Sequence, residues 1–285
     1  MTNKGIEASV TGGLIRKENF NWNLTVNVTT VKNEITAMPK ETPELVSSPY
    51  KRAVGRSLYD YYTRTYYGVD PENGNALYLG LADGVTYDAS NPEHKLIENN
   101  GRVDTVTSNH NSARQSWLDK SAIPPVYGSV VNDFTYKNFD FRFVLTYSVG
   151  GYFYDGYYAG LMSSGPSNGA NLHSDLFGAW KNPGDVTDIP RMDVGRTSQH
   201  GAASSRWLTK ASYLNISAIN VGYRIPESFS GRIGIKRARI YASAENLYFW
   251  SAKKGFNPVG GLTGPTGNSS YNHARTFNFG INFGL

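Results

Sequence analysis

The feature that most constrains this chain is the strict alternation of its last eleven residues, 275–285. Successive side chains of a strand point to opposite faces, so this segment has one fully apolar face and one small, polar face. The stretch is about as long as a tilted strand that crosses a bilayer. A soluble sandwich would bury the apolar face under a second sheet, whereas an outer-membrane barrel would expose it to lipid. The apolar positions are Phe277, Phe279, Ile281, Phe283 and Leu285, and the positions between them are Asn278, Gly280, Asn282 and Gly284.

The composition is compatible with a β protein that crosses a membrane. Only 18% of the 285 residues are charged, against roughly 25% in an ordinary soluble domain, and 13% are aromatic. The mean hydropathy of −0.44 does not exclude a membrane protein, because only half of a transmembrane β-strand is apolar. No apolar run is long enough for a transmembrane helix, and the first residues do not read as a signal peptide.

Charge and cysteine usage narrow the functional classes. The net charge of +5 is spread without blocks of Lys or Arg, which favours a solvated loop surface over nucleic-acid binding. The absence of cysteine excludes a disulfide scaffold and a thiolate metal site. We therefore expect neither a nucleic-acid partner nor a cofactor.

Alternating segments elsewhere predict further antiparallel strands. The clearest hairpin spans 126–136 and 139–150, with a two-residue turn at 137–138. In its second strand, one face carries Phe139, Phe141 and Phe143, and the other carries Asp140 and Arg142. The remaining predicted strands are 5–14, 20–35, 57–67, 76–81, 213–225, 237–249 and the closing segment.

The predicted connections alternate between short and long, which is typical of an outer-membrane barrel with tight periplasmic turns and extended outer loops. The short turns are 15–19, 68–74, 137–138 and 226–236, and the long loops are 36–55, 82–125, 151–212 and 251–273. We predict an all-β, antiparallel transmembrane barrel segment of about nine strands, of which 76–81 is the least regular. Single-chain bacterial barrels have even strand numbers, so residues 1–285 are expected to be the C-terminal part of a larger barrel.

Several short motifs, in order along nearly the whole chain, resemble the SusC/RagA family of TonB-linked outer-membrane proteins. Two of them are the turn Gly-Val-Asp-Pro-Glu-Asn-Gly at 68–74 and the loop Trp-Lys-Asn-Pro-Gly-Asp at 180–185, followed by Thr-Asp-Ile-Pro-Arg at 187–191. Each motif alone is weak, and their order makes the resemblance specific. The others lie at 3–7, 136–139, 212–215, 222–226, 239–247 and 275–277.

This resemblance implies a 22-stranded type of barrel whose lumen is blocked by a plug. It implies uptake of glycans or peptides at the cell outer membrane, a SusD-like surface lipoprotein that acts as a lid, and opening by the TonB complex. The plug, the TonB-contacting segment and the signal peptide are then expected upstream of this chain. No catalysis is expected.

Aromatic residues in the predicted loops are the best candidates for contact with a substrate or with the lid protein, because their faces stack on sugars and pack on proteins. The alternative is that some belong to the aromatic girdle that anchors any barrel in its membrane. The candidates are Tyr152, Tyr154, Tyr157, Tyr158, Trp180, Trp250 and Phe256.

Metal and catalytic sites are weakly indicated. The five histidines, at 94, 110, 173, 200 and 273, have no zinc-motif spacing. Asp185, Asp188 and Asp193 allow a calcium site, although turn capping is the better interpretation. The Gly-x-Ser-x-Gly elbow of a serine hydrolase is absent. The leading hypothesis is an importer, and the rival hypotheses are a small outer-membrane barrel enzyme and a soluble β-sandwich carbohydrate-binding module.

Overall fold

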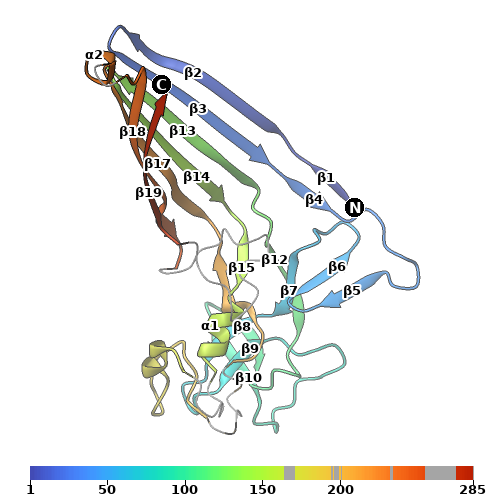
Figure 1. Cartoon of the computed structure of the whole chain (residues 1–285). Coiled ribbons are helices and arrows are strands. Elements are labelled where there is room, and N and C mark those ends of the chain that lie inside the picture. Colours follow the sequence, from blue (N-terminus) through green and yellow to red (C-terminus); the bar gives the residue numbers. More distant parts are fainter. Residues whose placement is uncertain are drawn as a thin grey trace.

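The computed structural model describes residues 1–163, 171–193, 195, 199, 201–231, 234–253 and 274–284. Its main element is one sheet of seven antiparallel strands in the order β19-β18-β17-β14-β13-β3-β2 (Figure 1). In this sheet each strand pairs with the next one along the chain, so the strands run alternately up and down. Their bounds are Glu7–Lys17 (β2), Phe20–Thr30 (β3), Val126–Tyr136 (β13), Phe139–Val149 (β14), Tyr213–Ile225 (β17), Arg237–Ser251 (β18) and Thr276–Gly284 (β19).

Short connections lie at one end of this sheet and long ones at the other (Figure 1). β2 and β3 are joined by residues 18–19, and β13 and β14 by residues 137–138. Residues 226–236 join β17 and β18 and include the short helix α2 (Glu227–Ser230). The long connections are 31–125, which is described throughout, and 150–212, which is described in part; most of the connection between β18 and β19 lies outside the described residues. Three of the four short turns predicted from the sequence, 15–19, 137–138 and 226–236, are thus confirmed as connections at the same end of the sheet.

The main sheet has seven strands, which corrects the expected count of about nine. The segments predicted as strands at 57–67 and 76–81 lie outside this sheet, in the long connection between β3 and β13. The turn at 68–74 therefore belongs to the long-loop end, and the predicted loops 36–55 and 82–125 are parts of one excursion. Local alternation cannot show which sheet a strand joins, because pairing partners lie far away in the sequence.

The long connections fold into small sheets of their own. One has the order β10-β11-β9-β8 and another the order β12-β7-β6-β5, while β1 pairs with β4 and β15 with β16. The predicted irregular loop at 82–125 thus contains three strands. The bounds are Thr2–Lys4 (β1), Lys32–Glu34 (β4), Glu44–Ser47 (β5), Tyr50–Ala53 (β6), Asp60–Arg64 (β7), Tyr66–Val69 (β8), Ala76–Leu79 (β9), His94–Asn99 (β10), Arg102–Thr107 (β11), Gln115–Ser121 (β12), Tyr152–Tyr154 (β15) and Leu208–Lys210 (β16).

One face of the seven-stranded sheet is apolar, and it is exposed. Residues paired across neighbouring strands share a face, so the register joins the apolar rows of all seven strands into one surface. The row that contains Phe279 continues through Ala242 and Val221 to Phe141 and Phe134. On β19 the side chains at 277, 279, 281 and 283 are 61%, 82%, 66% and 66% exposed. A sandwich would have buried these side chains, so the structure favours a surface that meets lipid.

Aromatic side chains concentrate at both ends of this apolar face. Near the short turns, Phe139 contacts Tyr223, with 4.6 Å between the ring centroids. Near the long loops, the exposed rings of Tyr248 and Trp250 on β18 contact each other, with 4.5 Å between their centroids. Aromatic rings at two levels are typical of the two interfaces of a transmembrane barrel.

A polar side chain on the apolar face has a partner. Asn132 lies in the row of Leu24 and Phe143. Its Oδ1 accepts a hydrogen bond from the indole Nε1 of Trp22 at 3.1 Å. An unpaired amide in hydrocarbon costs several kcal/mol, roughly 4–8 on the alkane scale, so this pair makes Asn132 tolerable there.

The opposite face is polar and is organised around an ion pair. Arg239 on β18 reaches across β17 to Asp140 on β14, with Nη2 and Oδ2 2.5 Å apart. The guanidinium lies over Gly222, where a Cβ atom would collide with it. In the same way, the ring of Tyr241 lies over Gly280 on β19. Glycine on this face therefore makes room for side chains of the neighbouring strand.

The helical content is small. It comprises α1 (Gly156–Leu161), the 3-10 helices η1 (Ser174–Gly178) and η2 (Ser205–Trp207), and α2. No helix among the described residues has the length and apolarity needed to cross a membrane.

Replacing an apolar-face residue by arginine tests the assignment of the two faces. Phe143 and Val144 are neighbours in the middle of β14 and point to opposite faces. In the protein encoded by the complete gene, Phe143→Arg should lower the free energy of unfolding by about 2–4 kcal/mol, the cost of arginine at the bilayer midplane. The control Val144→Arg, on the polar face, should cost less than about 1 kcal/mol. Denaturant titration in lipid vesicles measures both, and equal costs would contradict the assignment.

Candidate functional site

Two of the motifs that carry the family resemblance pack against each other in the long-loop region. The indole of Trp180 covers Gly74, and its Nε1 donates to the carbonyl of Pro71 at 3.1 Å. The backbone N–H of Arg191 donates to the carbonyl of Gly74 at 2.8 Å, and Arg191 Nε donates to Asn75 Oδ1 at 3.2 Å. The turn at 68–74 and the loop at 180–191 lie far apart in the sequence and form one structural unit.

A buried carboxylate organises the turn at 68–74. Asp70 is 1% exposed, and its carboxylate accepts from the backbone of Glu72 and from Asn73 Nδ2. Lys95 on β10 lies 2.8 Å from Asp70 Oδ2 and 2.5 Å from Glu72 Oε2. The buried charge thus has a cationic partner and hydrogen-bond donors, which it needs in order to be stable there.

Two of the three aspartates that allowed a calcium site, Asp185 and Asp193, have other partners. Asp185 Oδ2 accepts from the backbone N–H groups of Lys181 and Asn182, both at 2.9 Å, and these bonds lower the pKa of Asp185. Asp193 accepts from a backbone N–H and lies 3.4 Å from Arg191 Nη2. The carboxylate of Asp185 therefore caps a turn, as the better of the two interpretations predicts.

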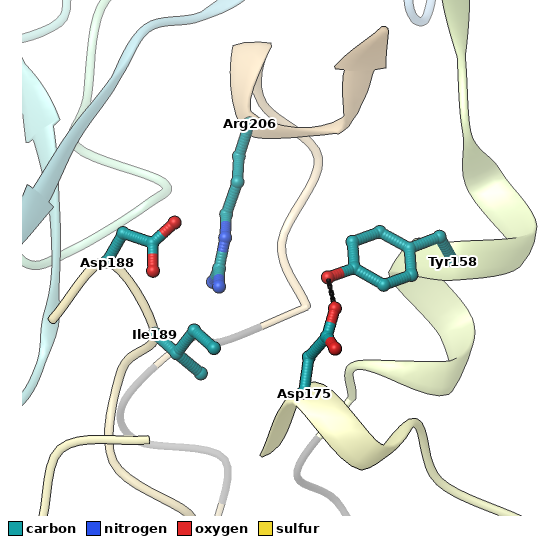
Figure 2. Close-up of a pocket in the computed structure, with 5 residues that line it drawn as sticks. All are labelled: Tyr158, Asp175, Asp188, Ile189 and Arg206. Carbon is teal, nitrogen blue, oxygen red and sulfur yellow. Dashed lines mark hydrogen bonds between the residues drawn. The ribbon is translucent and has the colours of Figure 1, made fainter. Parts of the chain in front are cut away.

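A cavity of about 390 Å³ lies beside this unit, among Tyr158, Asp175, Asp188, Ile189 and Arg206 (Figure 2). Its walls come from α1, η1, η2 and the loop at 187–191. The guanidinium of Arg206 points into the space between Asp188 on one side and the Tyr158–Asp175 pair on the other (Figure 2). Two of the lining residues, Tyr158 and Ile189, pack against a small core of Ala159, Met162, Leu176 and Trp207.

Tyr158 is held in place by groups on both sides. Its hydroxyl donates to Asp175 Oδ2 at 2.6 Å, and Lys253 Nζ lies 3.1 Å from its ring centroid. The same ammonium donates to Asp155 Oδ2 at 2.9 Å, and Asp155 also caps α1. Burial raises the pKa of Tyr158, and the bond to Asp175 raises it further. The phenol therefore stays protonated and acts as a hydrogen-bond donor, not as a nucleophile.

Arg206 is placed by aromatic rings. Its Cζ lies 5.0 Å from the ring centroid of Tyr66 and 4.8 Å from that of Trp207. The hydroxyl of Tyr66 donates to the backbone carbonyl of Asp188 at 2.8 Å. The cavity combines a guanidinium, two carboxylates and a phenol, so its chemistry suits the binding of a polar ligand and not a covalent reaction.

Three of the sequence candidates lie in or next to α1. Tyr154 on β15 packs against the small core, and burial raises its pKa to about 12. Tyr157 is exposed, and Tyr158 lines the cavity. Tyr152, also on β15, lies under the ammonium of Lys120, which is 4.9 Å from its ring centroid.

The other candidates lie elsewhere. Trp180 covers Gly74 and holds two loops together. Trp250 is in strand β18, on the exposed apolar face, which favours the girdle alternative for this residue. Phe256 lies outside the described residues.

Sequence reasoning missed Asp175, Ile189 and Arg206 as cavity residues. They are polar or aliphatic side chains in three separate segments, and no spacing rule connects such segments. The histidines at 94, 110 and 173 are hydrogen-bonded to nearby backbone groups, and those at 200 and 273 lie outside the described residues.

No family model matches this chain. Curated relatives, in contrast, match nearly the whole chain. TonB-dependent receptor P3 of Formosa agariphila is 26% identical over 308 residues, which cover 99% of this chain and 28% of the receptor. TonB-dependent receptor SusC of Bacteroides thetaiotaomicron is 25% identical over 298 residues, which cover 99% of this chain and 26% of the receptor. The chain thus spans only about a quarter of the length of these relatives.

Solved structures agree on the fold. A chain of the RagAB peptide transporter superposes with a TM-score of 0.80 at 22% identity, covering 98% of this chain and 29% of that chain. The RagAB peptide importer in its closed-closed state gives a TM-score of 0.79 at 24% identity, with the same coverage. The resemblance stated from the sequence is confirmed: over nearly its whole length this chain is similar to TonB-dependent receptors, SusC among them.

Gly74 tests whether Trp180 holds the loop unit together. Gly74 has φ +74°, and a Cβ atom there would collide with the indole ring. Gly84 has φ +82° with nothing near its Cβ position, so Gly84→Ala is a matched control for the backbone cost alone. We expect Gly74→Ala to destabilise the unit by about 1–3 kcal/mol more than Gly84→Ala does, through displacement of the ring. Hydrogen exchange of residues 68–75 and 180–191 measures this, and equal effects of the two variants would argue against the role of Trp180.

Proposed function

We propose that this chain, as a homologue of TonB-dependent receptors, forms part of the barrel wall and outer loops of an outer-membrane nutrient importer. The observation that carries the proposal is the seven-stranded sheet with an exposed apolar face and a polar opposite face. Lipid on one side and a wet lumen on the other stabilise a sheet of this kind. This chain covers only about a quarter of the length of its relatives, which supports the proposal that residues 1–285 are one segment of a larger barrel.

The polar face has the chemistry of a passage wall. Its side chains include amides and hydroxyls such as Asn278, Ser243 and Asn220, which lie in one row across three strands. Such groups exchange hydrogen bonds with water and with a polar solute at little cost. Arg239 is neutralised by Asp140, so it does not present a bare charge to a passing solute. We infer transport through this lumen without chemistry on the solute.

The long-loop region is the proposed place of contact with substrate and with a SusD-like surface lipoprotein. It lies at the end of the main sheet opposite to the short turns (Figure 1). The exposed ring of Tyr157 and the cavity beside Tyr158 are the contact candidates that the structure leaves accessible. The substrate class is an oligosaccharide or a peptide, and the RagAB neighbours, which are named peptide transporters, support the second. Energy is proposed to come from the TonB complex through a segment outside this chain.

The two rival functions have less support. A carbohydrate-binding sandwich needs a second sheet over the apolar face, and the side chains at 277–283 are exposed instead. A barrel enzyme needs an activated nucleophile, and the described cavity holds a phenol whose pKa is raised.

Uptake by intact cells tests the proposal. Deletion of the complete gene should abolish accumulation of labelled oligosaccharides or labelled peptides, and the wild-type gene should restore it. Dissipation of the proton gradient should stop the same uptake, because TonB coupling depends on energy from the inner membrane. Mass spectrometry should show that the purified protein leaves the solute unchanged. Uptake that persists after deletion of the gene, or that continues after the proton gradient is dissipated, would contradict the proposal.

A further inference from the structure

Arg64, the last residue of β7, carries a charge that no ion pair within the described part of the chain neutralises. Its Nε is buried and has no hydrogen-bond partner. Among the described residues, no carboxylate forms an ion pair with it, although most other buried or half-buried cations of the loop region have one, such as Lys51 with Glu44 and Lys95 with Asp70. A partly buried guanidinium without an anion is costly, so its retention calls for an explanation.

A second unpaired polar group lies beside it. Ser204 is 1% exposed, and its Oγ has no hydrogen-bond partner. An isolated parallel bridge pairs Ser204 with Arg64, and the antiparallel ladder of β12 and β7 pairs Gln115 with Arg64. Partners in a ladder present their side chains on the same face. Gln115, Arg64 and Ser204 therefore form one row of hydrogen-bond donors across three chain segments.

Of the described residues, those that act electrostatically on Arg64 include no carboxylate. The positive charge of Arg64 acts on the titratable groups of Tyr78 and His110. The hydroxyl of Tyr78 donates to the carbonyl of Gln199, and His110 Nε2 is 2.8 Å from the carbonyl of Ala203. Burial lowers the pKa of His110, and the positive charge of Arg64 acts in the same direction. Both neighbours are thus neutral and engaged elsewhere.

We propose that Arg64, Ser204 and Gln115 form a binding site for an oxyanion, the carboxylate or sulfate group of a ligand that enters the long-loop region. A planar guanidinium donates two parallel hydrogen bonds to such a group, and a hydroxyl and an amide complete its coordination. Arg64 is half-buried, so part of its side chain meets solvent, and its Nε and Ser204 Oγ are buried, where the exclusion of water strengthens a hydrogen bond to an anion that enters. The site does not depend on the import proposal, because binding is measured at equilibrium without transport.

Calorimetric titration of the complete protein in detergent, at constant ionic strength, tests this site. The probes are galacturonate with galactose as its neutral counterpart, trialanine with trialanine amide, and sodium sulfate. We expect at least one anionic probe to bind, its neutral counterpart to bind about tenfold more weakly or not at all, and Arg64→Gln to weaken the anion by about tenfold or more. Binding of galacturonate alone identifies an acidic sugar, binding of trialanine alone a peptide carboxylate, and binding of sulfate alone a sulfated ligand.

Two further variants keep the result interpretable. Ser204→Ala removes the buried hydroxyl and should weaken the same probe several-fold; it decides the matter if Arg64→Gln does not fold. Arg102→Gln is the control, because Arg102 is exposed and already paired with Asp104 at 2.8 Å, and it should leave the affinity unchanged. If no anionic probe binds the wild-type protein, or if both Arg64→Gln and Ser204→Ala bind it as tightly as the wild type, the site does not exist.

Discussion

The structure depends on one constraint, the continuous hydrogen-bonded pairing of seven antiparallel strands. In hydrocarbon every backbone N–H and C=O must find a partner within the protein, and a ladder between neighbouring strands provides it. The register also decides the faces: a slip by one residue would turn the phenylalanines of β19 to the polar side and its asparagines to lipid. The pairing of Phe279 with Ala242, and of Ala242 with Val221, therefore fixes both the stability of the sheet and the separation of lipid from lumen.

Irregularities in the sheet preserve this separation. In β17 the apolar residues change phase, from Leu214 and Ile216 to Ile219 and Val221. Opposite β14 the register shifts at this point, where Leu145 pairs with Ile216 and Val144 with Ala218, and the extra residue of β17 returns both sets to the apolar face. The phase change is visible in the sequence as a break in alternation, and the bulge is its physical explanation.

Much of the main sheet follows from alternation and turn length alone. The hairpin of β13 and β14 was predicted with its two-residue turn, and the closing strand with its two faces, because these features are local. The segments at 57–67 and 76–81 were placed in the wrong sheet, because their partners β12 and β11 lie more than 25 residues away. The candidate site was less predictable than the fold. Tyr158 was predicted because it is an aromatic loop residue. Arg206 and Ser204 were not predicted, because the residues around them come from distant segments that only the fold brings together.

The central claim is that the row of phenylalanines on β19 faces lipid and the intervening asparagines face water. Residues 1–285 contain no cysteine, so single cysteines at positions 277 to 283 accept a spin label once any cysteine elsewhere in the complete protein has been replaced by serine. Collision with oxygen, which partitions into lipid, and with a water-soluble nickel chelate reports the environment of each label in the membrane-embedded complete protein. The account predicts oxygen accessibility at 277, 279, 281 and 283 and nickel accessibility at 278, 280 and 282. Uniform accessibility along the strand, or the opposite alternation, would contradict it.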